Sequence, residues 1–112
     1  MKTTVRGARG EAIATAYLEK LGFEILHRNL RLSRLEIDIV CRDRDTLVFV
    51  EVKHSLSAKF GHPATWIDER KQAKLRQAAE MYLEKYDIKN TDIRFDAVTI
   101  SGGKIDYFPN AF

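Results

Sequence analysis

The chain has 112 residues, 45% of them hydrophobic and 31% charged, so we expect one folded domain over residues 1–112 and not a disordered segment. It has no apolar run near the ~20 residues that span a bilayer, no apolar signal peptide and a single cysteine, which predicts a cytoplasmic protein without membrane contact. The net charge is +3, and residues 1–34 hold seven Lys or Arg against three acids, which suits contact with a polyanion, although a solvated basic surface is the alternative.

The first half of the chain predicts one helix followed by three strands. Residues 9–21 carry apolar side chains at helical spacing and end before Gly22, which is typical of a helix C-terminus. Residues 23–31 alternate loosely between apolar and polar and predict a first strand. Residues 35–42 and 46–53 are rich in Ile and Val and predict two stronger strands joined by a short turn.

The second half predicts a helix between a loop and two further strands. Residues 54–65 contain glycine and proline and predict a loop, and residues 66–86 have the apolar stripe of a long helix. Residues 93–100 predict a strand, and a Gly102-Gly103 turn leads to a short last strand at 105–108. The order α-β-β-β-α-β-β predicts an α/β fold with a mixed sheet and helices on its faces.

The hairpin of the two central strands carries the most informative pattern. A two-residue turn at Arg44-Asp45 places Asp38 opposite Glu51 and Glu36 opposite Lys53. Opposed residues of an antiparallel pair point to the same face, with Cβ atoms ~5 Å apart. The other face is expected to be wholly apolar and covered, and it consists of Leu35, Ile37, Ile39, Cys41, Val48, Val50 and Val52.

Two facing carboxylates beside a lysine have a chemical consequence. They repel one another unless a cation or a proton lies between them, and Mg²⁺ commonly takes one or two protein carboxylates together with phosphate oxygens. An ammonium at Lys53 can hold the attacking water or stabilise charge on the phosphate. The pattern therefore predicts phosphodiester hydrolysis with Mg²⁺ or Mn²⁺. The alternative is an exposed cross-strand salt-bridge cluster, which is common in proteins and contributes little.

Asp38 followed after twelve residues by Glu51-Val52-Lys53 resembles the signature of the PD-(D/E)xK nuclease superfamily. Further motifs over about residues 7–112 resemble the YraN family, a bacterial family of endonuclease-like proteins. Many members of that family have Gly-Glu-Ile-Asp where this chain has Leu35-Glu36-Ile37-Asp38. The motifs include Gly10-Glu11, Gly22-Phe23-Glu24-Ile25-Leu26, Arg28-Asn29-Leu30-Arg31, Phe60-Gly61-His62-Pro63, Arg94-Phe95-Asp96 and Asn110-Ala111-Phe112.

The resemblance implies a fold and a role for each matching residue. It implies a restriction-endonuclease-like αβββαβ core and cleavage of DNA to a 5′-phosphate and a 3′-hydroxyl. Asp38 and Glu51 would bind the metal, with the carbonyl of Val52 as a further ligand, and Lys53 would assist the nucleophile. Glu11, expected in the first turn of the first helix, resembles the helix carboxylate of such sites, although a solvated glutamate is also favoured there by the helix dipole.

Substrate and partners are less constrained by the sequence. Lys71 and Lys74 lie near the start of the long helix, where cations oppose the helix dipole, so they are expected to bind phosphate unless they belong to an ordinary charged face. The similarity to archaeal Holliday junction resolvases implies branched or single-stranded DNA as substrate and a homodimer. The rival hypotheses are a non-catalytic nucleic-acid- or partner-binding domain that keeps the nuclease fold, and RNA as the substrate.

Four other residues have structural roles as their main predictions. Cys41 lies in an apolar strand and is expected in the core. Arg94 and Asp96 are expected to pair with one another or to brace the core. Trp66 is expected to pack in the core or at the helix start, with stacking on a base as the alternative.

Overall fold

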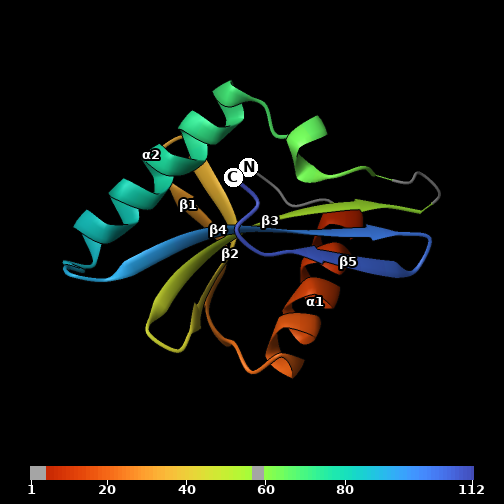
Figure 1. Cartoon of the computed structure of the whole chain (residues 1–112), viewed down its shortest axis with the longest axis horizontal. Coiled ribbons are helices and arrows are strands. Elements are labelled where there is room, and N and C mark those ends of the chain that lie inside the picture. Colours follow the sequence, from red (N-terminus) through yellow and green to blue (C-terminus); the bar gives the residue numbers. More distant parts are fainter. Residues whose placement is uncertain (1–4, 57–59) are drawn as a thin grey trace.

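The computed structural model places two helices on opposite faces of a five-stranded sheet (Figure 1). It describes residues 5–56 and 60–112, and only the backbone of residues 5–8. The elements are α1 (Val5–Lys20), β1 (Glu24–Leu32), β2 (Leu35–Asp43), β3 (Thr46–Ser55), the 3₁₀ helix η1 (Pro63–Thr65), α2 (Glu69–Lys85), β4 (Asp92–Ser101) and β5 (Lys104–Phe108). This order confirms the predicted α-β-β-β-α-β-β succession and the restriction-endonuclease-like αβββαβ core.

The sheet is mixed, as predicted, with its strands in the order β1-β2-β3-β4-β5. Strands β3 and β4 are parallel and all other neighbours are antiparallel. A parallel pair needs a crossover connection, and the segment that contains α2 supplies it. The hairpin β2–β3 has the predicted register, because Asp43 pairs with Thr46 and the pairing continues to Ile39 and Val50.

The helices begin and end at positions that differ from the predicted ones. Helix α2 begins at Glu69 and not at residue 66, because Asp68 caps it: its carboxylate accepts a hydrogen bond from the Lys71 backbone N–H at 2.8 Å. Helix α1 begins before residue 9 and ends at Lys20, and Gly22 follows with a φ of 93°. Part of the predicted loop 54–65, residues 57–59, lies outside the described residues.

Neither helix has both the length and the apolar composition to cross a membrane, as far as the described part of the chain shows.

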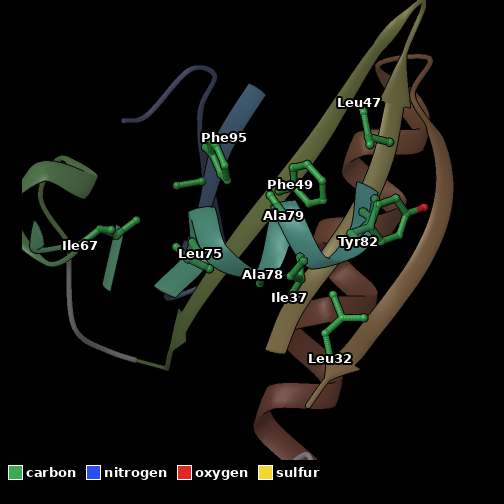
Figure 2. Close-up of a cluster of buried hydrophobic side chains, with 12 residues drawn as sticks. Leu32, Ile37, Leu47, Phe49, Ile67, Leu75, Ala78, Ala79, Tyr82 and Phe95 are labelled. Atoms are coloured by element: carbon green, nitrogen blue, oxygen red, sulfur yellow. The ribbon is translucent and has the colours of Figure 1, made fainter. Parts of the chain in front are cut away.

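Helix α1 covers one face of the sheet and α2 covers the other. On the α1 side the buried residues include Ile39, Cys41, Val48 and Val50, which confirms this part of the predicted apolar face. Burial raises the pKa of the Cys41 thiol to about 12, so this cysteine is a core residue as predicted. The larger cluster on the α2 side is drawn in Figure 2 and includes Ile37, Val40, Leu47, Phe49, Leu75, Ala78, Ala79, Tyr82 and Phe95.

The predicted alternation of β2 is wrong at its first residues. Ile37 and Val40 both pack on the α2 side, although they lie three residues apart and strict alternation would put them on opposite faces. Leu35 packs on the α2 side as well. On the neighbouring strand, Asn29 lies between Arg28 and Leu30, which pair with Ile39 and Ile37, and it has a φ of 50°, outside the extended conformation of a regular strand. The face of β2 therefore changes at Asp38.

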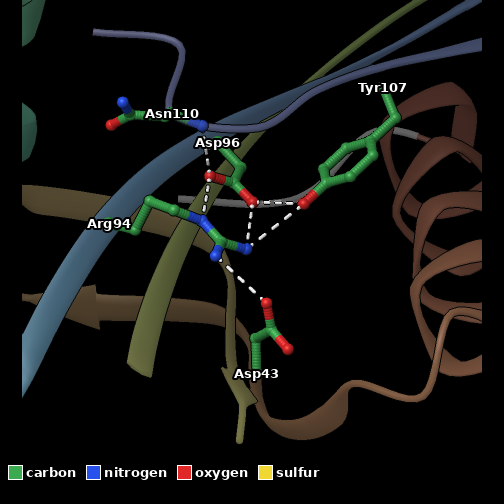
Figure 3. A network of polar contacts seen from close by, with 5 residues as sticks. All are labelled: Asp43, Arg94, Asp96, Tyr107 and Asn110. Atoms are coloured by element: carbon green, nitrogen blue, oxygen red, sulfur yellow. Dashed lines mark hydrogen bonds and ion pairs between the residues drawn. The ribbon is translucent and has the colours of Figure 1, made fainter. Parts of the chain in front are cut away.

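Strands β4 and β5 are tied to the hairpin by a buried polar network (Figure 3). The Asp96 side chain is fully buried and accepts hydrogen bonds from Arg94 at 2.9 and 3.0 Å, from the Tyr107 hydroxyl, and from the Asn110 backbone N–H at 2.8 Å. Arg94 also donates to Asp43 at 3.0 Å. The predicted pairing of Arg94 with Asp96 is confirmed, and the network links β2, β4 and β5.

Candidate functional site

The two predicted carboxylates meet where the β2–β3 ladder ends. The last paired residues are Ile39 and Val50, and Asp38 and Glu51 come next on each strand. The Asp38 carboxylate accepts a hydrogen bond from the Val52 backbone N–H at 2.8 Å. In a continued register Val52 would pair with Ile37, so a carboxylate takes the place of a main-chain partner. The strand pairing gives way here to a side-chain site.

Glu51 lies between an acid and a cation. Its side chain is 12% exposed, and Lys71 Nζ lies 3.3 Å from Oε2. Burial, a hydrogen bond with Asp38 and the charge of Asp38 together raise the pKa of Glu51 to about 8, while Lys71 opposes the shift. The pair therefore favours one shared proton over two charges. This surplus of negative charge on oxygen ligands is what a hard divalent cation would neutralise.

Glu11 approaches the same place from α1. It is only 7% exposed, and its pKa is raised by burial and by the charges of Asp38 and Glu36, against a smaller opposing effect of Arg28. The sequence predicted Glu11 in the first turn of the helix, and this is wrong, because α1 already begins at Val5. Within the described ranges, no three His, Cys, Asp or Glu side chains are grouped so that they could hold a metal ion together. Glu11 therefore interacts electrostatically with Asp38 but does not complete a three-residue ligand set.

A glycine allows α1 to lie close to β3 beside the site. A Cβ on Gly10 would meet the Cβ of His54 at 3.0 Å and its Nδ1 at 3.1 Å, closer than side chains normally pack. The His54 ring therefore lies against α1, on the side of the sheet opposite to Lys71 and α2. The close approach of α1 at Gly10 brings the next residue, Glu11, toward the end of the hairpin.

Lys53 has different neighbours from those predicted. Its ammonium lies 5.3 Å from the centre of the Phe60 ring and 5.2 Å from the centre of the Trp66 ring. Glu36, the predicted partner of Lys53, instead forms an ion pair with Arg31 at 3.5 Å. The sequence did not predict these aromatic contacts.

A cleft of about 780 Å³ opens above the two carboxylates. Its walls include Lys71 and Lys74, so both predicted phosphate-binding lysines do line it. Three arginines line it too, and the sequence analysis assigned none of them to the site. Two of them, Arg31 and Arg34, belong to the basic segment 1–34. The five cations of the lining are Arg31, Arg34, Arg70, Lys71 and Lys74, and the four acids are Glu36, Asp38, Glu51 and Asp68.

The raised pKa of Glu51 predicts a pH dependence of stability for the metal-free protein. An acid whose folded pKa lies above its usual 4.5 stabilises the fold at low pH, and this stabilisation is lost as the pH rises from about 4.5 through about 8. Glu51→Gln has no such proton to lose. In EDTA, we expect the Tm of the variant to rise relative to that of the wild type between pH 5 and pH 8.5. The difference should be roughly 4 °C for each kcal/mol of stability that the wild type loses. Parallel Tm curves for the two proteins would contradict this.

The family model and two similar relatives agree on one protein family. The family model described as "Uncharacterised protein family UPF0102" matches residues 10–100. A UPF0102 protein of Persephonella marina is 40% identical over 112 residues, which cover 100% of this chain and 97% of the relative. A UPF0102 protein of Caldicellulosiruptor saccharolyticus is 44% identical over 94 residues, which cover 84% of this chain and 80% of the relative.

One solved structure with a similar fold is the EndoMS-dsDNA2 complex. The similarity has a TM-score of 0.46 and 19% sequence identity. It covers 90% of this chain but only 37% of the EndoMS chain, so this chain spans well under half of that protein.

Proposed function

The chain belongs to the uncharacterised protein family UPF0102, the YraN family, and we propose that it is a divalent-metal-dependent nuclease that hydrolyses phosphodiester bonds in DNA. One observation carries the proposal. Two hydrogen-bonded carboxylates, Asp38 and Glu51, lie at the unpaired end of a hairpin and form part of the lining of a basic cleft. Acids placed for a cation and cations placed for phosphate suit a reaction on a phosphodiester.

Asp38, Glu51 and the carbonyl of Val52 would hold Mg²⁺ or Mn²⁺. The N–H and the C=O of one strand residue point to the same side, so the Val52 carbonyl faces β2, as does the N–H that binds Asp38. When bound, the ion would lower the pKa of a water molecule and neutralise phosphate oxygens. Two carboxylates and a carbonyl are enough for Mg²⁺, which usually keeps several waters.

Lys53, Glu11 and the lysines of α2 have separate roles in this proposal. Lys53 shares a face of β3 with Glu51, and its ammonium would stabilise charge that develops at the phosphate. Glu11 would accept a proton or a hydrogen bond from the attacking water on the α1 side. Lys71 and Lys74 would bind backbone phosphates of the substrate. A second copy of the chain in a homodimer would extend the contact with DNA.

The test is the cleavage of labelled single-stranded, duplex, flapped and four-way-junction DNA, in Mg²⁺, in Mn²⁺ and in EDTA. We expect metal-dependent cutting by the wild type. Lys53→Met keeps an unbranched apolar side chain against Phe60 and Trp66 but removes the charge, and we expect cleavage about 10²–10³-fold slower, as for the loss of one electrostatic stabiliser. Lys104→Met, at an exposed lysine of β5, is the matched control and should cut normally.

The outcome also separates the rival functions. Cutting of RNA in preference to DNA would reassign the substrate. Binding of DNA by folded protein without any cutting would favour a non-catalytic domain that keeps the nuclease fold. A Lys53→Met variant that cuts at the wild-type rate would remove Lys53 from the chemistry.

A further inference from the structure

We propose that the cleft binds one unpaired strand of nucleic acid, whose backbone runs between the β1–β2 turn and the first two turns of α2. The path of the strand rests on the proposed function, since the strand would pass over Asp38 and Glu51. We go further and assign Arg34 and Arg70, which line the cleft from two different chain segments, as phosphate-binding residues.

The first wall is a rigid hairpin turn. Leu32 pairs with Leu35, so Ser33 and Arg34 form a two-residue turn, in which Ser33 has a φ of 58°. Leu32 is 4% exposed, and both leucines belong to the hydrophobic cluster under α2. Because the turn is anchored on both sides in this core, Arg34 is held at the cleft at little cost in chain entropy.

The second wall is the start of α2. Arg70 and Lys74 lie in its first two turns, where the helix dipole disfavours a cation. Asp68 caps the helix at 2.8 Å, and cations cannot accept hydrogen bonds from its N-terminal N–H groups, so these cations do not stabilise the helix start. A bound anion would offset their unfavourable position. Two separate chain segments thus present cations to one cleft, as expected for a backbone that passes between them.

Three of the cleft cations are available for a ligand. Arg31 is paired with Glu36 at 3.5 Å, and Lys71 is paired with Glu51 at 3.3 Å. Within the part of the chain that the structure describes, no carboxylate lies within 4.0 Å of the cationic groups of Arg34, Arg70 or Lys74.

The size of the cleft favours an unpaired strand. Its volume of about 780 Å³ is typical of sites that enclose one drug-sized molecule, on the order of 300–1,000 Å³. A nucleotide with its flanking phosphates falls in this size range, whereas a base pair with both of its backbones does not. The volume therefore matches one nucleotide strand better than a duplex, and this is why we assign a single strand to the cleft.

The test measures binding alone. Fluorescence anisotropy in EDTA follows a labelled 12-nucleotide DNA strand, an RNA strand of the same sequence, and the corresponding DNA duplex, at several salt concentrations. We expect Arg34→Gln/Arg70→Gln to bind the DNA strand at least 10-fold more weakly than the wild type. The slope of log K against log salt should fall by about 0.7 for each lost phosphate contact. Arg44→Gln is the matched control, because Arg44 is an exposed turn residue at the far end of β2.

Each outcome decides the inference. Equal binding by the double variant and the wild type, or an equal loss in Arg44→Gln, would overturn it. Tighter binding of the duplex, lost in the double variant, would overturn the assignment to an unpaired strand, whereas a wild-type preference for single strands that the double variant loses would support it. Equal binding of the DNA and RNA strands would support the inference, because it is what recognition through the phosphates predicts. If the cleft binds as expected but no substrate is cut in metal, the proposed function fails and this inference stands.

Discussion

Asp38→Asn is expected to abolish both the metal-dependent cleavage of DNA and the stabilisation of the fold by Mg²⁺. The asparagine oxygen can still accept the hydrogen bond from the Val52 N–H, so the end of the hairpin keeps its geometry. The negative charge is lost, and with it one of the two carboxylates that would hold the ion. At a metal concentration 100 times the dissociation constant, the wild type should gain about 2.7 kcal/mol from binding, and the variant almost nothing.

The measurement is thermal unfolding with increasing Mg²⁺ or Mn²⁺, alongside the cleavage assay. Asp45→Asn is a matched control, because Asp45 is an exposed acid in the turn at the other end of the same hairpin. It should bind metal and cut DNA as the wild type does. A Tm shift in Asp38→Asn as large as that of the wild type would place the metal elsewhere in the molecule.

Asp96→Ala is expected to lower the free energy of unfolding by about 3–5 kcal/mol, the typical cost of removing one partner of a buried ion pair. Asp96 is fully buried, and it accepts hydrogen bonds from Arg94, Tyr107 and the Asn110 N–H (Figure 3). Without it, Asp43 is the one charged partner that the Arg94 guanidinium keeps among the described residues. A loss of this size is a large fraction of the total stability of a domain, about 5–15 kcal/mol.

Urea denaturation compares this variant with two others. Asp96→Leu/Arg94→Leu removes both charges and should be less destabilised than Asp96→Ala, because the one carboxylate that loses its partner, Asp43, has a side chain that is 30% exposed. Asp43→Asn should cost less than either, because the Asp43 side chain is 30% exposed and Arg94 keeps Asp96. If Asp96→Ala lost less than 1 kcal/mol, the network would contribute little to the stability of the fold.

The sequence predicted the hairpin well because its turn constrains the register. The Arg44-Asp45 turn and the Ile- and Val-rich strands leave few alternative pairings, and the pairing follows the prediction from Asp43 and Thr46 to Ile39 and Val50. The prediction became wrong at the next residues of β2, where the buried face changes and Asn29 on the neighbouring strand has a positive φ. A positive φ in a strand has no reliable sequence signal, since most asparagines adopt ordinary conformations.

The side-chain partners of the candidate site were harder to predict than the strands. Asp38 and Glu51 follow from the register of one hairpin, which depends on local pairing. The contacts of Lys53 with Phe60 and Trp66, and the entry of Arg34 into the cleft, depend on how distant segments pack. Such tertiary placement is not encoded in the spacing of residues along one element.

The contact between Lys53 and Trp66 gives the protein an optical signal of its own. Trp66 is the single tryptophan of the chain, and its indole N–H donates to the Gly61 carbonyl at 3.3 Å, while the Lys53 ammonium lies 5.2 Å from the ring centre. Excitation selective for indole therefore reports on one location, beside a residue of the candidate site. A charge that enters or leaves the surroundings of that ring changes its emission, so unlabelled protein in a stopped-flow instrument can time each event at the site.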